Sequence, residues 1–236
     1  MAIKGILFDK DGTLIDVTGT WVPAYHEVLG ELFGRDAEKI EAMLVAAGYD
    51  PAKSNFTSGS ILASGTTREL VNVWWPGLDQ EDVLEKLHLL DVEYRDVALK
   101  HLKSLMPLEP ILSALRTRGL RLGVATNDTQ GSALSHLTEL GAAMLFDAVI
   151  GADSVTVPKP SGDMVRKFAE ITGLAPAEIA LVGDNPHDIA EARNGGAGLA
   201  IGVLSGNSRH DDLEPIADHI IPSIAHLDAL LAEIGR

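Results

Sequence analysis

Two aspartates separated by one residue follow the first apolar stretch of the chain, which covers residues 3–8 and is typical of a buried strand. In an extended chain alternate side chains share a side, so Asp9 and Asp11 are expected to lie together and Lys10 to point away. Neighbouring carboxylates repel each other, and a divalent cation between them is one way to keep both ionised. Gly12 permits a sharp turn that presents backbone N–H groups to an anion. The alternative interpretation is a solvated acidic turn that caps a strand.

Further polar residues follow later apolar stretches. Thr126 and Asn127 end one stretch, Asp184 and Asp188 follow another, and Lys159 stands between two prolines just before a predicted helix. Singly, each has a structural explanation: helix capping for the threonine, surface charge for the lysine, and turn or helix-start positions for the acids. Together they supply acids, one fixed cation and hydroxyl and amide donors. These are the groups that phosphoryl transfer through a divalent metal requires.

Short apolar stretches and helical segments alternate from about residue 108 to the C-terminus. The stretches typical of strands cover residues 120–125, 148–151, 179–182, 199–203 and 219–221. Helical segments that stop at glycine cover residues 110–118, 132–140, 161–172 and 189–194. This alternation predicts an α/β fold, a parallel sheet with helices on both faces. Because ligands bind at the carboxyl edge of such sheets, we expect the polar residues to converge there.

Residues 16–106 interrupt the alternation with segments of helical character. Helices are expected at residues 21–33, 36–47, 66–74 and 79–103. In the last of these, Val83, Leu90 and Tyr94 recur on one helical face, and Asp79 is expected to cap the N-terminus. The pattern predicts an all-helical insertion between the first strand and the rest of the sheet.

The composition limits the classes of protein to which the chain can belong. Its 236 residues fit one α/β domain with a sizeable insertion. The 34 acidic and 19 basic side chains give a net charge of −15, which disfavours nucleic acid and anionic membranes as partners. The absence of cysteine excludes disulfides, thiol catalysis and thiolate metal sites. No apolar stretch is long enough for a signal peptide or a membrane helix, so we expect a cytoplasmic protein, either monomer or homodimer.

In order and spacing, the polar motifs resemble those of the haloacid dehalogenase (HAD) superfamily, and within it the phosphoglycolate phosphatase-like hydrolases. The resemblance rests on DKDGTL at residues 9–14, Thr126, Lys159 and GDNPHD at residues 183–188. It implies a catalytic core with a Rossmann-like doubly wound parallel sheet, formed by residues 1–15 and 107–236, and a helical cap domain at residues 16–106. It also implies a magnesium-dependent phosphatase for small phosphorylated metabolites, such as phosphoglycolate or sugar phosphates.

The same resemblance implies a role for each motif residue. Asp9 would attack phosphorus to give an aspartyl-phosphate, and Asp11 would protonate the leaving oxygen and later activate water. Mg²⁺ would be held by Asp9, the backbone carbonyl of Asp11 and Asp184, and Asp188 would support it through water or an indirect contact. The phosphoryl oxygens of the substrate would be bound by Gly12, Thr126, Asn127 and Lys159.

Lys10 departs from this pattern, because relatives often carry an apolar residue between the two aspartates; the local packing or electrostatics is therefore open. In the insertion, Trp21 and Tyr25 could face a substrate, although core packing is the favoured interpretation. Arg68 is expected at the surface rather than against a substrate carboxylate. The segment around Ser64 and Gly65 is expected to be a loop that either sets specificity or connects helices.

Three other functions remain as alternatives. A sugar phosphomutase similar to β-phosphoglucomutase shares all of these motifs and the cap, and the sequence separates it only weakly from a phosphatase. A dehalogenase of the same superfamily needs neither a second catalytic aspartate nor a metal, so Asp11 and Asp184 count against it. A non-enzymatic receiver domain also places Asp, Thr and Lys at strand ends, but such domains are about half as long and lack the cap.

Overall fold

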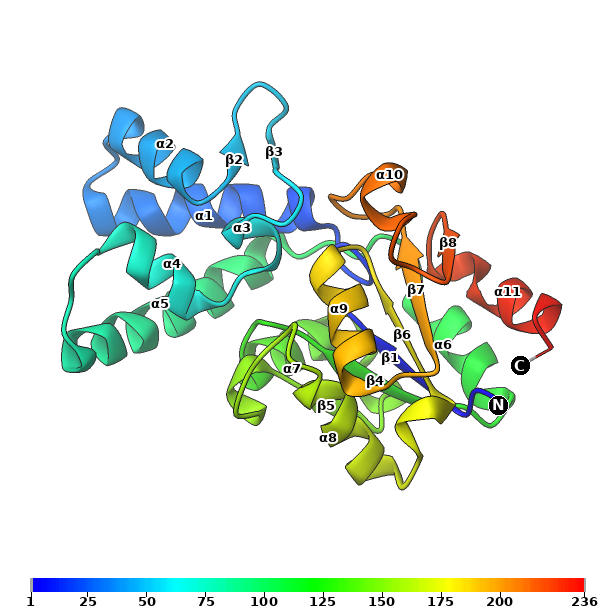
Figure 1. The fold of residues 1–236 in the computed structure, drawn as a ribbon. Coiled ribbons are helices and arrows are strands. Elements are labelled where there is room, and N and C mark those ends of the chain that lie inside the picture. The colour runs from blue at the N-terminus through cyan, green and yellow to red at the C-terminus, as the bar shows by residue number, and fades with distance from the viewer. Residues whose placement is uncertain (1, 236) are drawn as a thin grey trace.

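The computed structural model describes residues 2–235, and within that range it contains a sheet of six parallel strands in the order β5-β4-β1-β6-β7-β8 (Figure 1). The strands are β1 (Gly5–Phe8), β4 (Arg121–Ala125), β5 (Ala148–Ile150), β6 (Ile179–Gly183), β7 (Leu199–Val203) and β8 (His219–Ile221). The first strand in sequence lies near the middle of the sheet, where it pairs in parallel with β4 and β6. The carboxyl ends of these three neighbours therefore deliver their loops to one place.

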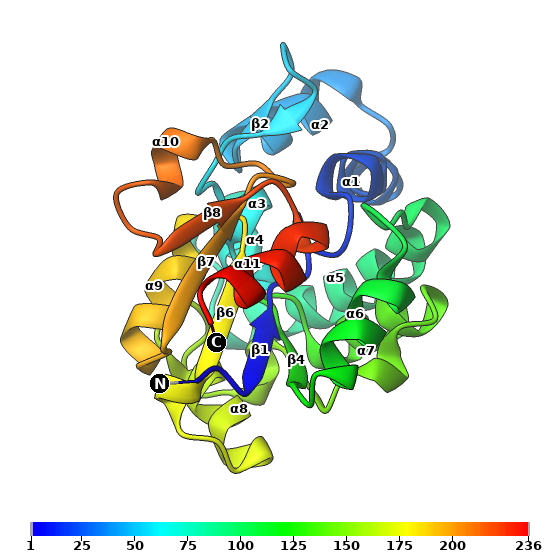
Figure 2. The same ribbon diagram turned by 90° about the vertical axis from the view of Figure 1, so that its right-hand side faces the viewer.

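Helices cover both faces of the sheet, as the alternating pattern predicts. One face is covered by α6 (Leu108–Thr117), α7 (Gln130–Glu139) and α11 (Leu227–Glu233), the other by α8 (Asp163–Thr172) and α9 (Pro186–Gly195). Ile6 and Phe8 of β1 are buried against the first layer and Leu7 against the second, which follows from the two-residue period of a strand. Figure 2 views the sheet from the side on which α11 lies.

The insertion is helical and has its own hydrophobic cluster, drawn from residues between Val17 and Ala98. Its helices are α1 (Val17–Phe33), α2 (Ala37–Ala46), α3 (Ile61–Ser64), α4 (Thr67–Trp74) and α5 (Gln80–His101). The Asp79 side chain caps α5 by accepting from the backbone N–H groups of Glu81 and Asp82, as predicted. A short hairpin of β2 (Tyr49–Asp50) and β3 (Asn55–Phe56) adds to the expected helices. Two residues per strand are too few to leave an alternating pattern in the sequence.

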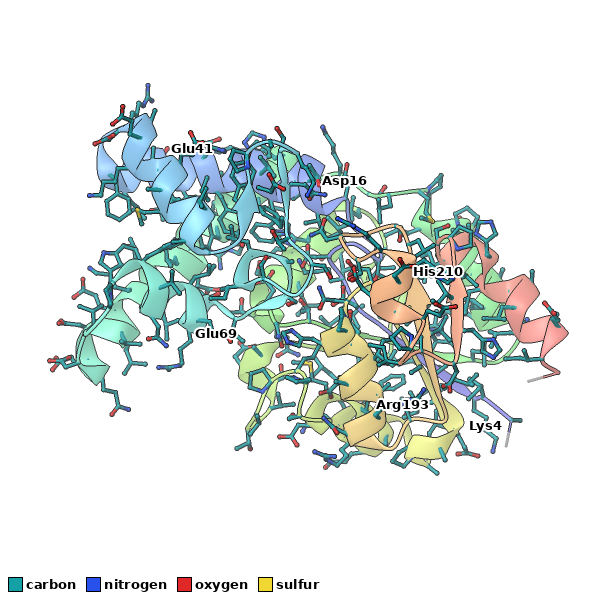
Figure 3. All side chains as sticks on the ribbon, turned by 45° about the horizontal axis from the view of Figure 1, so that its top comes forward. Lys4, Asp16, Glu41, Glu69, Arg193 and His210 are labelled. Carbon is teal, nitrogen blue, oxygen red and sulfur yellow. The ribbon has the colours of Figure 1, made fainter. Side chains whose placement is uncertain are left out.

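The two chain segments that connect the insertion to the sheet lie side by side. The Asp16 backbone N–H donates to the carbonyl of Lys103 at 2.9 Å, and the Leu105 N–H donates to the carbonyl of Leu14 at 3.2 Å. Figure 3 labels Asp16 at this junction, where its side chain also caps α1. This arrangement supports the proposed division into a core domain, residues 1–15 and 107–236, and a cap domain, residues 16–106.

The predicted fold class, a doubly wound parallel sheet with an inserted helical cap, is confirmed by this architecture. A further helix, α10 (His210–Leu213), follows β7. No helix among residues 2–235 is both long and apolar enough to cross a membrane.

Candidate active site

Three carboxylates converge at the carboxyl edge of the sheet. Asp9 follows β1, Asp184 follows β6, and Asp188 lies in the first turn of α9. All three are buried, and each offers an oxygen within 4.8 Å of the others. The sheet geometry brings together residues that are up to 179 positions apart in the sequence, as the motif analysis predicts.

Lys159 supplies a positive charge to this cluster, which we call the Lys159 cluster: Lys159, Asp9, Asp184 and Asp188. Its Nζ donates to Asp9 Oδ1 and to Asp188 Oδ1, both at 2.7 Å, and its side chain is 3% exposed. Burial alone would lower the pKa of Lys159, but the carboxylates of Asp188 and Asp9 raise it above its ordinary value. This lysine is therefore a fixed cation and not a proton donor at neutral pH.

One ammonium does not neutralise three buried carboxylates. Burial, reinforced by Asp188, raises the pKa of Asp9 to about 7 even though Lys159 opposes the shift. Burial and the charges of Asp9 and Asp188 likewise raise the pKa of Asp184 well above its usual range. Both shifts report negative charge that the protein leaves uncompensated.

The donor set of the Lys159 cluster fits a small, hard divalent cation. Carboxylate oxygens are the ligands that Mg²⁺ prefers, and a dication would offset the charge that raises the two pKa values. Asp184 is further positioned by the backbone N–H of Asn207, which donates to its Oδ2 at 2.9 Å. Gly12 makes room for it: the residue has φ 87°, and a Cβ there would stand 2.6 Å from the Asp184 carboxylate.

Gly12 itself is not part of the lining of the pocket that contains the other predicted site residues. Its N–H donates to the carbonyl of Ile15 at 2.8 Å. The close approach to Asp184 explains the glycine better than an exposed N–H group does.

A second buried charge cluster lies beside the first, on the Asp11 side of the strand end. The Lys10 side chain has no exposed surface, and its Nζ lies 2.7 Å from Asp11 Oδ2, 3.3 Å from Asp128 Oδ2 and 3.3 Å from His136 Nδ1. The expectation that Lys10 points away from the aspartates is wrong for its ammonium group. The strand ends at Phe8, so strict alternation does not extend to Lys10, and its long side chain reaches Asp11.

We call this second group the Lys10 cluster: Lys10, Asp11, Asp128 and His136. Burial and the charges of neighbouring members shift the pKa values within it. Burial would raise the pKa of Asp11, but Lys10 lowers it below its ordinary value. Burial raises the pKa of Asp128 despite the same lysine. Burial and the Lys10 ammonium lower the pKa of His136 to about 3, so this imidazole is neutral at pH 7.

Trp21 of the cap reaches into the core and contacts Asp11. Its indole Nε1–H donates to Asp11 Oδ1 at 2.6 Å, and its ring meets the imidazole of His136 edge to face. Core packing is thus only part of its role. A tryptophan early in a helix gives no signal in the sequence that its partner is a carboxylate ten residues earlier.

Thr126 and Asn127 lie where the motif analysis places them, at the end of β4 and in the pocket. The Asn127 side chain accepts from the backbone N–H of Lys159 at 3.0 Å and donates to the carbonyl of Ser64 in the cap at 2.8 Å. It therefore positions the lysine loop and joins it to the 61–65 segment. Arg68 is exposed and does not line the pocket, in agreement with its predicted place at the surface.

The pocket also contains residues outside the set of predicted site residues. Asp91 and Tyr94 of α5, Asp128 and His187 join the motif residues there. Asp128 comes directly after Thr126 and Asn127 at the end of β4, so its position could have marked it. Tyr94 was expected on the inner face of its helix, but a helical period does not tell a core position from a pocket wall.

Comparisons with known proteins agree with this geometry. Residues 3–196 match the family model of haloacid dehalogenase-like hydrolases. The phosphoglycolate phosphatase of Escherichia coli K12 is 30% identical over 223 residues, covering 87% of this chain and 84% of that protein. Among solved structures, a haloacid dehalogenase-like hydrolase from Bacteroides fragilis has a TM-score of 0.75 at 22% identity, covering 95% of this chain and 99% of that one.

The same fold occurs in a Thermotoga maritima structure designated as a β-phosphoglucomutase, with a TM-score of 0.66 at 19% identity and coverage of 98% of this chain and 100% of that one. The fold alone is thus shared by hydrolases and by a protein named for a mutase. The family match, by contrast, spans the first strand, the insertion and the motifs at Lys159 and Asp184. The chain belongs to the haloacid dehalogenase-like hydrolases.

Proposed function

We propose that the protein is a magnesium-dependent phosphatase that hydrolyses small phosphate monoesters through an aspartyl-phosphate on Asp9. The observation that carries the proposal is the Lys159 cluster, in which three buried carboxylates share a single ammonium at the carboxyl edge of the sheet. A site with this excess of negative charge can receive a phosphate dianion only together with a cation.

The residues of the cluster and of the adjoining loops have separate roles in the proposed phosphoryl transfer. Asp9 is the nucleophile, since its carboxylate stands at the end of the central strand and faces the pocket. Lys159, with Thr126 and the Asn127 amide, binds the phosphoryl oxygens in transit. Asp9, Asp184, the backbone carbonyl of Asp11 and, through water or directly, Asp188 would hold Mg²⁺. When bound, the ion would neutralise the cluster and polarise the phosphoryl group.

Asp11 is proposed as the general acid and base. It lines the pocket but its carboxylate lies outside the group of three that can share a cation. Lys10 and Trp21 each hold one of its oxygens, which fixes the orientation of the carboxyl group. Lys10 lowers the pKa of Asp11, but a phosphate dianion bound beside the carboxyl would raise it, so that the group can carry a proton to the leaving oxygen. As a carboxylate it can then take a proton from the water that hydrolyses the intermediate.

The cap is proposed to close over the bound ester. Contacts with the core surround the pocket: Trp21 to Asp11, Asn127 to Ser64, and the Thr129 hydroxyl to Asp91 at 2.6 Å. Closure of this kind excludes water during transfer and leaves room for a compact leaving group. We therefore expect action on small esters and not on phosphoproteins or nucleic acid ends.

Phosphate release from a panel of monoesters, measured with Mg²⁺ and with chelator, tests the proposal. We expect release that stops on chelation and returns with added Mg²⁺. Full activity in chelator contradicts the metal assignment. A phosphorylated sugar that is isomerised with little release of phosphate would establish the sugar phosphomutase instead.

A further inference from the structure

The wall of the pocket that faces the phosphoryl site belongs to the cap, and it is aromatic and aliphatic. Trp21, Tyr25 and Tyr94 line it together with Val17, Leu62 and Leu70, and the pocket has about 810 Å³ of empty space, part of it open to solvent. Because the phosphoryl group occupies the core side, the leaving alcohol of any substrate must lie against this cap wall.

Among the described residues that line the pocket, Lys159 is the only lysine or arginine. Its Nζ is already shared by Asp9 and Asp188 on the core side. His187 also lines the pocket, but it belongs to the first turn of α9 in the core and not to the cap wall. The cap wall therefore offers no side chain that would pair with a negative leaving group.

The N-terminus of α4, which borders the pocket at Thr67, is the other place where an anion could be held. It is already filled by a carboxylate of the cap. Glu69 Oε2 accepts from the Thr66 backbone N–H at 2.7 Å and from the Thr66 hydroxyl at 2.9 Å, forming a capping box. A negative carboxylate therefore already lies at this helix end and offsets its positive dipole.

The wall does carry groups suited to an uncharged partner. The Tyr94 hydroxyl is buried without a hydrogen-bond partner, and such a group gains most from a ligand that supplies one. Burial, followed by the charges of Asp11 and Asp128, raises the pKa of Tyr25, and burial raises that of Tyr94, so both remain neutral hydroxyls. Asp91 also faces the pocket and would repel an anion.

Resting on the proposed phosphatase activity, we propose that the substrate is a phosphate monoester whose leaving alcohol carries no negative charge. The alcohol packs on Trp21 and Tyr25 and meets the Tyr94 hydroxyl, whereas a carboxylate there would be desolvated beside Asp91 without a counter-ion. Phosphoglycolate, the substrate in the names of several relatives, is on this reasoning a poor substrate for this protein.

Two matched pairs of esters test the inference, with kcat/KM measured by phosphate release in excess Mg²⁺. One pair is phosphoglycolate and its carboxamide; the other is 4-carboxyphenyl phosphate and phenyl phosphate. We expect the uncharged member of each pair to be favoured by at least about tenfold, the penalty for burying one unpaired charge. Equal rates within the pairs, or a preference for the carboxylates, would overturn the inference while leaving the phosphatase intact. No release from any ester would instead contradict the proposed function.

Substitutions in the cap wall test whether its residues determine the preference for the uncharged esters. Thr67→Lys places an ammonium beside the leaving group and should shift the ratio toward the carboxylates by at least about tenfold, whereas Thr67→Gln should not. Asp91→Asn should shift it in the same direction, and Asp96→Asn, which removes the same charge from the exposed face of α5, should leave it unchanged. Thermal denaturation verifies that each variant folds. Unchanged ratios in both Thr67→Lys and Asp91→Asn would show that this wall does not contact the leaving group, and the inference would fail.

Discussion

Two buried lysines contact the two aspartates that follow β1, and their surroundings differ. Lys159 lies between two carboxylates of a cluster that remains negative, so the charge it supplies is incomplete and a further cation fits there. Lys10 lies between Asp11 and Asp128, with a neutral imidazole as third neighbour, so its ammonium faces two carboxylates and the cluster has a smaller excess of negative charge. The cluster with the larger excess of negative charge is suited to binding a cation, whereas the ion pairs of the Lys10 cluster are suited to positioning the Asp11 carboxyl group.

The largest expected effect concerns Asp9, the proposed nucleophile of the Lys159 cluster. Asp9→Asn should lower kcat by about 10⁴-fold or more, because an amide is a poor nucleophile and a weaker ligand for a cation. Phosphate release measures it, with thermal denaturation to verify the fold. Asp11→Asn serves as the comparison: it should be severely impaired in turnover but still form phospho-enzyme from an activated ester. Hydrolysis near the wild-type rate by Asp9→Asn would exclude the covalent mechanism.

Lys159→Ala should cost about 10²–10³-fold in kcat, the scale for loss of one preorganised group that stabilises transferring charge. Lys167→Ala is the matched control, because that lysine lies on α8 nearby with an exposed side chain. Steady-state kinetics with saturating Mg²⁺ checks the difference. If Lys159→Ala keeps full activity, the cluster does not bind the phosphoryl group in the way proposed.

Lys10→Met should lower stability, in addition to disturbing the Asp11 carboxyl group that Lys10 orients. Removing the ammonium leaves the Asp11 and Asp128 carboxylates buried without their partner, at a cost of roughly 3–5 kcal/mol in the free energy of unfolding. Urea denaturation measures the loss. Adding Asp128→Asn to the variant should restore part of it, since one unpaired charge is then removed. No recovery in the double variant would mean that the pair does not interact as the structure indicates.

The convergence of the Lys159 cluster could be predicted from the sequence and that of the Lys10 cluster could not, for a physical reason. Asp9, Thr126, Lys159 and Asp184 each lie at or after the end of a strand or in an adjoining loop, and a parallel sheet brings such positions together whatever the details of packing. The Lys10 cluster depends on a side chain folding back beyond the strand end and on His136, which lies 126 residues away. No periodicity encodes that contact.

The sequence likewise does not predict which cap residues line the pocket. The apolar faces of α1, α2, α4 and α5 predict these helices, whereas α3 lies in a segment that was expected to be a loop. How the inserted body is placed on the core decides which helix faces line the pocket. Trp21 and Tyr94 thus belong both to the cap cluster and to the pocket wall. The unpaired hydroxyl of Tyr94 and the indole donor of Trp21 become visible only once the two bodies are placed together.

Trp21→Phe tests whether the cap positions Asp11. The variant keeps an aromatic ring and removes the Nε1–H donor, so kcat should fall by up to about tenfold with little change in KM, the scale of one hydrogen bond. Trp74→Phe is the control, because the Trp74 indole donates to the carbonyl of Met43 within the cap. Equal kcat values in the two variants would show that the Trp21 bond does not orient the catalytic carboxyl.

The last prediction concerns His136 and the pH dependence of stability. Its pKa is about 3 in the folded protein, against an ordinary value of about 6.5 in the unfolded chain. Between these values the unfolded state binds the extra proton, so the stabilisation is complete above pH 6.5 and is lost as pH falls, by about 1.4 kcal/mol per pH unit.

His136→Gln removes this titration and should flatten the slope by that amount relative to the wild type, as measured by urea unfolding between pH 4.5 and 7. Thr138→Gln, at an exposed position of the same helix, removes no titratable group and should keep the wild-type slope. Parallel slopes for His136→Gln and the wild type would show that the imidazole ionises in the folded protein. A charged imidazole beside Lys10 would add a second cation to the cluster, so that two cations would face the carboxylates of Asp11 and Asp128 and the cluster would carry no excess of negative charge.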